Sequence, residues 1–432
     1  MIKDLNKNIV ENSETYAREL DSRDPLKRYR EKFYIPLING KESIYFTGNS
    51  LGLQPKSTQD YVLNELEDWA NYGVEGHFHA RNPWLSYHEI FPPLLMEIFG
   101  AKEEELVVMN QLTVNLHVLM TSFYQPAGKR FKIICEEKAF PSDQYAFAAQ
   151  AKLHGFSPEE AIIEVGPREG ESISRTEDIL QVIKDNADEI SLVLFSGVNY
   201  YNGQVFDMER ITKAAHEAGA YCGFDLAHAA GNIPLHLHDW NVDFACWCSY
   251  KYLNSGPGGV AGAFIHERNI TKEWLRLAGW WGHDKKSRFK MPGTFQPIPT
   301  AEGWQLSNAP VLSMAAHRAS LEMFAEAGMP AIFEKAANLH AYARFVIEDI
   351  GKTNNNTLEI LTPKEKGKHG CQLSLKIKKN GKAIYEDLKK HGVLADWREP
   401  DVLRIAPVPL YNSYEDVYRF GKLLSEALKI QA

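Results

Sequence analysis

The sequence lacks the features that mark several specialised classes of protein. No run of consecutive apolar residues approaches the ~18 that a membrane-spanning helix needs. The segment from Met1 to Lys7 is polar overall and has no apolar core of the kind found in signal peptides, so we expect no secretory signal peptide. The 48 basic residues are outnumbered by 56 acidic ones, and the net charge of −8 argues against a nucleic-acid binder. These features predict a soluble, cytoplasmic protein that binds neither nucleic acid nor membrane.

Cysteine is scarce, with five residues in 432. The number is odd and no Cys-x-x-Cys pair occurs. Most of the cysteines lie in apolar runs; the five are Cys135, Cys222, Cys246, Cys248 and Cys371. This pattern favours reduced, buried thiols over a disulfide framework or a zinc site.

Two nucleotide-binding motifs are also missing. No Gly-x-x-x-x-Gly-Lys-Ser/Thr loop occurs, so nothing indicates a P-loop phosphotransferase. The segment Gly256–Ala261 matches the letters of a dinucleotide-binding fingerprint, but that motif needs a helix after it. Because the run Val260–Ile265 is typical of a strand, we reject this interpretation.

Short apolar runs alternate with helical patterns between about residues 105 and 270. The predicted strands are 131–135, 161–165, 191–195, 221–224, 243–248 and 260–265. An amphipathic helix is predicted over 206–219, with Gly219 as its left-handed end. This alternation predicts an α/β domain with a mostly parallel sheet covered on both faces. Ligands of such sheets bind beyond the carboxyl ends of the strands.

The pattern changes after about residue 310. A long helical stretch, 311–351, precedes two strand-like segments, 371–377 and 402–405, and a final helix. We therefore expect a second, smaller α+β domain. The predicted division is 1–59 as an N-terminal segment associated with the small domain, 60–308 as the large ligand-binding domain, and 309–432 as the C-terminal small domain.

The strongest chemical signal lies at two predicted strand ends. Asp225 begins Asp-Leu-Ala-His228, and Lys251 follows the apolar run Cys246–Cys248. An apolar approach disfavours a charged ammonium and leaves the lysine amine nucleophilic. A buried aspartate nearby suits pyridoxal phosphate, because its carboxylate keeps the pyridine nitrogen protonated. The pattern indicates a pyridoxal phosphate enzyme; a strand-end aspartate and a surface lysine are the alternative.

Further polar and aromatic residues fall at the same edge. Thr113 precedes the apolar helical run 114–124, so we predict it as the N-cap of a helix whose free N–H groups hold a phosphate. Phe140 follows the strand 131–135 and offers a ring that can stack on a planar cofactor. Ser196 follows the strand that ends at Phe195. Agreement among these positions strengthens the cofactor interpretation.

Together with the segments around them, these residues resemble a known family. From about Arg23 to Leu424 the sequence resembles the kynureninase family of fold-type-I pyridoxal phosphate enzymes. The similarity is densest in the segments 45–53, 112–117, 139–143, 223–228, 238–254 and 404–413. The segment His238–Asn254 is long enough to be specific to the family rather than to the fold. The resemblance implies a large domain with a mostly parallel sheet, a smaller α+β domain, and a homodimer with shared active sites.

The resemblance also implies roles around pyridoxal 5′-phosphate. Lys251 would form the covalent link to the cofactor and then act as base at the substrate Cα, and Tyr250 would donate a proton later. Asp225 would pair with the pyridine nitrogen. The remaining implied cofactor contacts are Leu112, Thr113, Phe140, Asp143, Ser196, His228, Tyr250, Trp280 and Asn308, with Trp280 supplied by the neighbouring chain.

For the substrate, the resemblance implies that Arg404 clamps the α-carboxylate, a bidentate task suited to guanidinium. Ser50, His77, Ser307 and Asn308 would also contact it, and the last three match the animal-type branch, which favours the 3-hydroxylated substrate. The implied reaction is hydrolysis of the Cβ–Cγ bond of L-kynurenine or 3-hydroxy-L-kynurenine. The products are an anthranilate and L-alanine, in tryptophan catabolism or NAD biosynthesis.

Two alternatives remain open. A cysteine desulfurase of the same fold would need a catalytic cysteine on a mobile loop, yet the alternation in Cys371–Ile377 predicts a strand and a structural thiol. A metal-dependent hydrolase would use His236 and His238, whose side chains point the same way on an extended segment.

Overall fold

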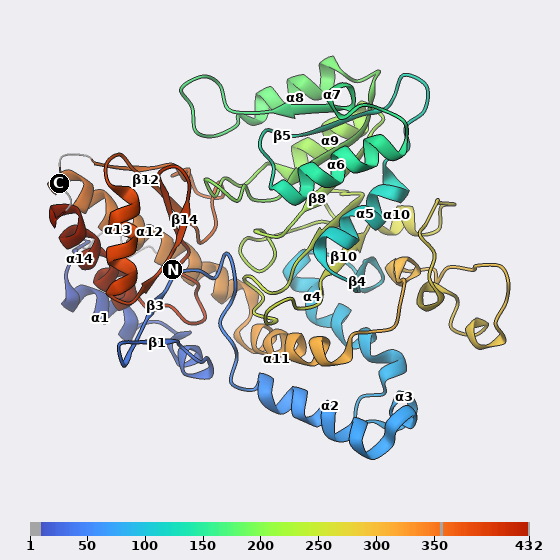
Figure 1. Ribbon diagram of the computed structural model, residues 1–432, viewed down its shortest axis with the longest axis horizontal. Helices are drawn as coiled ribbons and strands as arrows, with labels where there is room; N and C mark the ends of the chain where they lie inside the picture. The colour runs from blue at the N-terminus through green and yellow to red at the C-terminus, as the bar shows by residue number, and fades with distance from the viewer. Residues whose placement is uncertain (1–9, 355–356, 431–432) are drawn as a thin grey trace. The chain divides into compact units, whose positions relative to one another are not determined.

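The computed structural model describes residues 10–354 and 357–430, which fold as two compact units (Figure 1). The large unit comprises 58–199 and 205–322, and the small unit comprises the rest of the described chain, including 200–204. We predicted domain boundaries at 59/60 and 308/309. In the structure the corresponding boundaries between the two units fall at 57/58 and 322/323. Within the described ranges, no helix has both the length and the apolar character needed to cross a bilayer.

A seven-stranded sheet forms the centre of the large unit, in the order β4-β10-β9-β8-β7-β5-β6. Its strands are β4 (Leu106–Val108), β5 (Lys132–Glu136), β6 (Ile162–Val165), β7 (Ile190–Ser196), β8 (Tyr221–Asp225), β9 (Phe244–Trp247) and β10 (Gly262–Ile265). The five strands β5 to β9 run parallel, and β10 is antiparallel to both β9 and β4. All six predicted strands are confirmed to within two residues at each end, whereas β4 was not predicted. Because β10 is a strand, the rejection of the dinucleotide fingerprint before it is also confirmed.

The helices of the large unit are α2 (Thr58–Tyr72), α3 (Gly76–His79), α4 (Phe91–Phe99), α5 (Leu112–Phe123), α6 (Pro141–Leu153), α7 (Pro158–Ala161), α8 (Thr176–Asp185), α9 (Met208–Glu217) and α10 (Glu267–Ile270). Helices α4, α5 and α9 pack against strands of the sheet, whereas α2 and α3 lie away from it (Figure 1). Leu116, Leu119 and Phe123 of α5 pack in one core with residues of β5, β7 and β9. Gly219, two residues past α9, has φ +72, the left-handed conformation that was predicted for it.

A four-stranded sheet in the order β11-β12-β15-β14 organises the small unit. The elements of this unit are α1 (Glu14–Ser22), β1 (Leu37–Ile38), β2 (Lys41–Glu42), β3 (Ile44–Tyr45), α12 (Met329–Thr353), β11 (Leu358–Ile360), β12 (Leu373–Ile377), α13 (Gly381–Lys390), β13 (Val393–Leu394), β14 (Asp396–Arg398), β15 (Val402–Ile405) and α14 (Tyr414–Ile430). The predicted strands in 371–377 and 402–405 are confirmed. The predicted helical stretch 311–351 is instead two helices, α11 (Val311–Ala327) and α12, because Gly328 adopts φ +77 between them.

Candidate active site

The carboxyl ends of the parallel strands bring the predicted cofactor residues together. Asp225 is the last residue of β8, and Ser196 ends β7 as its direct register partner. The chain that leaves β9 reaches Lys251 four residues later. Since these strands are parallel neighbours, their ends meet at one edge of the sheet. The site therefore depends on the strand order and not on local sequence alone.

The amine of Lys251 lies between an imidazole and an aromatic ring. Its Nζ is 3.0 Å from Nε2 of His228 and 6.0 Å from the centroid of the Phe140 ring. Phe140 is 41% exposed although it sits at the start of α6, so part of its ring remains accessible to a planar ligand. The lysine amine and a partly exposed aromatic ring thus occupy the same corner of the site.

Two buried carboxyl groups, those of Asp225 and Asp143, interact behind the lysine. Asp225 accepts a hydrogen bond of 2.7 Å from the backbone N–H of Ala227. Burial, followed by the neighbouring Asp225, raises the pKa of Asp143 well above its ordinary value. Burial also raises the pKa of Asp225, but the Ala227 N–H and the charge of Lys251 oppose this shift. Burial and the neighbouring carboxyl group therefore favour the protonated form of Asp143.

The start of helix α5 is free to bind an anion, although the predicted cap was wrong. Gln111, not Thr113, is the N-cap, because Gln111 has extended φ/ψ values of −116° and 159° and the helix begins at Leu112. The Gln111 side chain makes no capping bond and donates to the carbonyl of Gly258 at 3.0 Å. Leu112 and Thr113 thus form the first turn, whose N–H groups can donate to a phosphate.

Tyr250, next to Lys251, keeps its phenolic proton. Burial is the main cause that raises its pKa, and the neighbouring Cys248 thiol adds to the shift. A neutral phenol at this position can serve as a proton donor.

Glu136 is a site residue that the sequence reasoning missed. It is the last residue of β5, is 2% exposed, and accepts a hydrogen bond of 2.9 Å from Asn199 Nδ2. Burial raises its pKa, and its charge acts on Asp143. The predicted strand ended at Cys135, which left Glu136 in a loop; an acidic residue ending an apolar strand was the available signal.

Four further predicted residues lie elsewhere in the large unit. Trp280 is 43% exposed and donates from Nε1 to the Arg288 carbonyl at 3.2 Å. His77, in α3, places Nδ1 2.9 Å from the Val74 carbonyl. Exposed Ser307 and Asn308 line a cavity of about 270 Å³ beside α5. Among the described residues, none of the four hydrogen-bonds to Lys251 or Asp225.

The two remaining predicted residues belong to the small unit. Arg404, on β15, is 1% exposed and donates to the Asp396 carboxylate and to the Tyr200 carbonyl. Ser50 is exposed and lines a cavity of about 420 Å³ together with Asp396 and Trp397.

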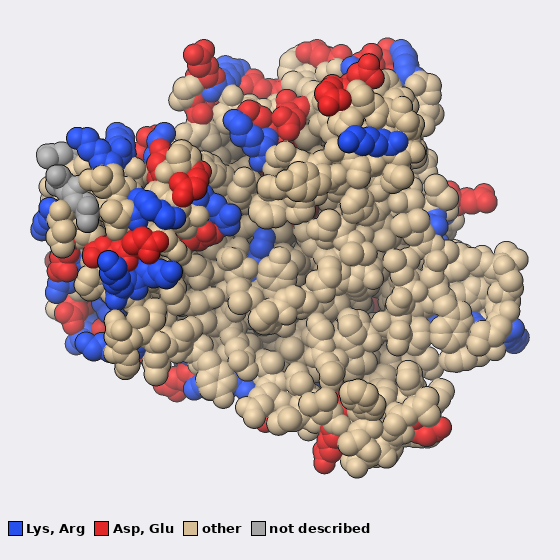
Figure 2. Space-filling view, viewed as in Figure 1, with Lys and Arg blue, Asp and Glu red and all other residues tan. Residues whose placement is uncertain are grey.

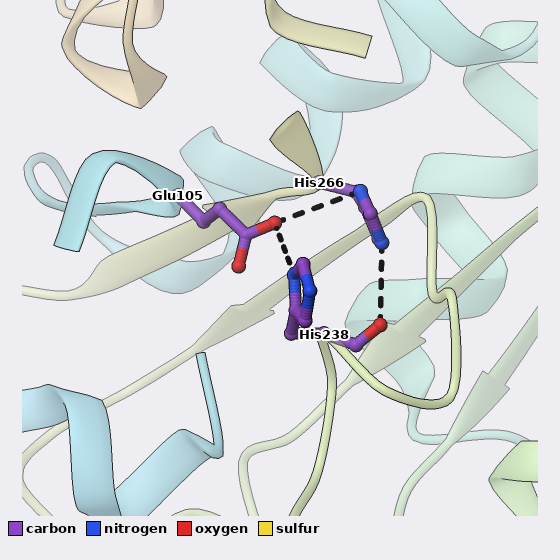
Figure 3. Close-up of side chains that lie close together, drawn as sticks. All are labelled: Glu105, His238 and His266. Atoms are coloured by element: carbon purple, nitrogen blue, oxygen red, sulfur yellow. Dashed lines mark hydrogen bonds and ion pairs between the residues drawn. The ribbon is translucent and has the colours of Figure 1, made fainter. Parts of the chain in front are cut away.

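The histidines proposed for a metal-dependent hydrolase do not act as a pair. His236 packs edge-on against Trp240, whereas His238 faces Glu105 and His266 (Figure 3). Glu105 Oε1 accepts from His238 Nδ1 and from the Glu267 backbone N–H, both at 2.9 Å, and His266 Nε2 lies 3.2 Å from the His238 carbonyl. These bonds join the turn before β4 to the turn after β10, so the cluster stabilises the fold at this edge of the sheet.

All five cysteines are buried and form no disulfide with one another, as predicted. Burial raises the pKa of the Cys371 thiol to about 12. A thiol so far from ionisation is a poor nucleophile, which disfavours the desulfurase alternative.

Comparisons with known proteins agree with the fold. A cysteine desulfurase from Thermococcus onnurineus has a TM-score of 0.72 at 17% identity, covering 95% of this chain and 98% of that one. A mutant of the protein C-DES, whose structure holds glycine covalently linked to the PLP cofactor, has a TM-score of 0.73 at 15% identity and covers 88% of this chain and 96% of that chain. The fold is therefore that of the fold-type-I pyridoxal phosphate enzymes.

Sequence relatives narrow this class. Kynureninase from Flavobacterium psychrophilum is 55% identical over 97% of this chain and 99% of its own length. Human kynureninase is 47% identical over 96% of this chain and 93% of its own. Residues 332–424 match the model of the kynureninase C-terminal domain. The chain belongs to the kynureninase family, as the sequence predicted.

Proposed function

We propose that this protein is a kynureninase that hydrolyses the Cβ–Cγ bond of L-kynurenine and 3-hydroxy-L-kynurenine, releasing L-alanine and the matching anthranilate. The arrangement around Lys251 carries the proposal: its amine lies 3.0 Å from His228 and 6.0 Å from the ring centroid of Phe140, with Asp225 buried nearby. Kynureninases are the relatives at high identity and nearly full coverage.

The residues present fit pyridoxal phosphate. The cofactor has an aldehyde, a pyridine nitrogen and a phosphate, and the site offers the Lys251 amine, the Asp225 carboxylate and the uncapped start of α5. The orphaned Oδ1 of buried Asp143 gives the site further hydrogen-bonding capacity. Ser196 and His228 complete the set on the cofactor side.

When bound, pyridoxal phosphate supplies a ring that accepts electrons from the substrate Cα. Asp225 would hold the pyridine nitrogen protonated, and Phe140 would pack against the ring. The Lys251 amine takes the proton from Cα, with His228 within hydrogen-bonding distance of its Nζ. Tyr250 donates a proton once water has added to the γ-carbonyl.

Substrate recognition divides between the two ends of the amino acid. The buried guanidinium of Arg404 binds the α-carboxylate, with Ser50 near the same end of the substrate. His77, Ser307 and Asn308 receive the aromatic end, where a hydrogen bond to the ring hydroxyl would favour the 3-hydroxylated substrate. Comparing kcat/KM for the two substrates tests this; a clear preference for plain kynurenine would contradict it.

We infer a homodimer in which the partner supplies Trp280. Exposed apolar side chains on α2, on α3 and on the turn between them support this, with six large ones between 39% and 73% exposed: Leu63, Leu66, Trp69, Tyr72, Val74 and Phe78. Figure 2 shows mostly uncharged side chains on the visible face of this part of the large unit, with acidic ones at its lower edge. Sedimentation should give twice the 49.0 kDa chain mass; a fully active monomer would refute the shared site.

Five reduced thiols suit a reducing compartment, so we place the enzyme in the cytoplasm. There it would act in tryptophan catabolism, or in NAD biosynthesis if the 3-hydroxylated product is the main one.

The Lys251→Ala variant tests the proposed function. It should lack the visible absorption band, give no borohydride-reducible cofactor adduct, and release no alanine. Lys213→Ala, which changes an exposed lysine on α9, is the matched control and should behave as the wild type. An intact band and normal turnover in Lys251→Ala would refute the assignment.

A further inference from the structure

The surroundings of Arg404 contain a charge arrangement that the proposed function does not explain. Strands β14 and β15 are antiparallel, and Asp396 lies directly opposite Arg404 in their register. Arg398 lies two residues after Asp396 on β14, so the two side chains leave the strand on the same face. The topology thus places one carboxylate between two guanidinium groups.

A single oxygen of Asp396 serves both arginines. Oδ2 accepts from Arg404 Nη2 and, at 3.0 Å, from Arg398 Nη2. The side chains are 1% exposed for Arg404, 16% for Asp396 and 36% for Arg398. Arg404 Nη1 donates to the Tyr200 carbonyl, which fixes the other side of its guanidinium. Asp396 is therefore a counter-ion of the buried arginine.

A substrate carboxylate can bind Arg404 in this arrangement only if the Asp396 carboxylate leaves its position beside Arg404. A buried guanidinium needs an anion beside it, and Asp396 provides that anion before substrate arrives. A substrate carboxylate that binds Arg404 bidentately must take the Nη2 position that Asp396 occupies. Arg398 offers Asp396 another partner, since its buried Nε has no hydrogen-bond partner among the described residues.

We propose that Asp396 is a positioning residue that holds Arg404 ready in the empty enzyme and transfers its ion pair to Arg398 when the substrate carboxylate binds Arg404. The inference rests on the proposed role of Arg404 in binding that carboxylate. Rotation of one side chain suffices, because Asp396 already contacts both arginines. After the transfer, Arg398 can hold Asp396 through Nε and Nη2 together, and each anion has its own arginine.

Binding of L-alanine to the holoenzyme, followed by the absorbance of the bound cofactor, tests the transfer. Ethylamine, which lacks the carboxylate, is the control ligand. Asp396→Asn removes the competing anion and should tighten L-alanine binding about tenfold, the scale of a charge-assisted hydrogen bond. Arg398→Gln removes the second partner and should weaken it about tenfold. Neither change should alter ethylamine binding.

The double variant separates transfer from a simple change of local charge. If Arg398 acts through Asp396, Arg398→Gln has little effect once Asp396→Asn is present, so the double variant binds L-alanine as tightly as Asp396→Asn alone. Equal effects of Arg398→Gln in both backgrounds would overturn the proposal, as would weaker L-alanine binding in Asp396→Asn. If Asp396→Asn does not fold, Arg398→Lys decides: it keeps the positive charge and should bind L-alanine more tightly than Arg398→Gln, whereas a loss equal to that of Arg398→Gln would overturn the proposal.

Arg404→Gln separates the proposed binding of the substrate carboxylate by Arg404 from the proposed transfer of Asp396 to Arg398. It should remove the preference for L-alanine over ethylamine; an unchanged preference would refute the role of Arg404 and the transfer with it. A lost preference in Arg404→Gln together with wild-type binding in Arg398→Gln would refute the transfer alone.

Discussion

The buried imidazole of His317 should lower the free energy of unfolding at acidic pH, and substitution of this one residue should remove that part of the pH dependence. Its side chain is 0% exposed on α11, stacks on Phe91 with ring centroids 5.7 Å apart, and has no hydrogen-bond partner for either ring nitrogen among the described residues. Burial lowers the pKa of this imidazole to about 3. Because the folded pKa is depressed, the protein loses stability as the pH falls below the unfolded value of about 6.5.

The size of the loss follows from the difference between the two pKa values. Each pH unit below about 6.5 costs about 1.4 kcal/mol until the folded pKa is approached. At two units below that value the penalty is about 2.7 kcal/mol. His317→Leu keeps an apolar side chain against Phe91 and removes the titrating group, so it should not incur this penalty.

Urea unfolding at several pH values measures the effect. The difference in unfolding free energy between His317→Leu and the wild type at pH 8, where the imidazole is neutral in both states, provides the baseline. Relative to that baseline, the variant should gain about 2.7 kcal/mol by pH 4.5. A difference that stays constant from pH 8 to 4.5 would refute the reasoning, because it would mean that the buried imidazole is protonated without cost.

Three further outcomes follow from the site and the core. Asp225→Asn should lower kcat by more than about 100-fold while cofactor still binds, because the neutral amide cannot hold the pyridine nitrogen protonated; steady-state kinetics on the reconstituted variant would show this. Cys371→Ala should retain full activity, and the native Cys371 thiol should not react with a thiol reagent until the protein unfolds, since its pKa is about 12. Gly223→Ala should destabilise the protein by about 1–3 kcal/mol in urea unfolding, because its Cβ would lie 2.3 Å from the ring of Phe244 in the adjacent strand.

Much of the large unit could be predicted because its strands are continuous apolar runs. Strand β4 escaped prediction since only three residues form it, directly after the acidic turn Glu103–Glu105. The break between α11 and α12 had a local signal, the sequence Gly328-Met-Pro, but the apolar pattern on either side resembles one long helix. Short edge strands and helix breaks are decided by packing against the rest of the fold.

The site was predictable as a set of strand-end residues, but its electrostatics were not. Asp225 and Lys251 follow apolar strands in the sequence, which is a local signal. The raised pKa of Asp143 arises only because Asp143 at the start of α6 and Asp225 at the end of β8 are buried close together in three dimensions. The ion pairs of Asp396 depend on the register of β14 with β15, and nothing in the segment 396–404 alone specifies that register.

Product analysis of the holoenzyme with L-kynurenine and with 3-hydroxy-L-kynurenine tests the proposed activity most directly. Fluorescence identifies anthranilate or 3-hydroxyanthranilate, and amino-acid analysis of the same samples quantifies L-alanine. We expect equal amounts of L-alanine and the matching anthranilate from at least one substrate, with none from Lys251→Ala. Absence of both products in the cofactor-loaded enzyme, or release of sulfide from cysteine in their place, would contradict the assignment.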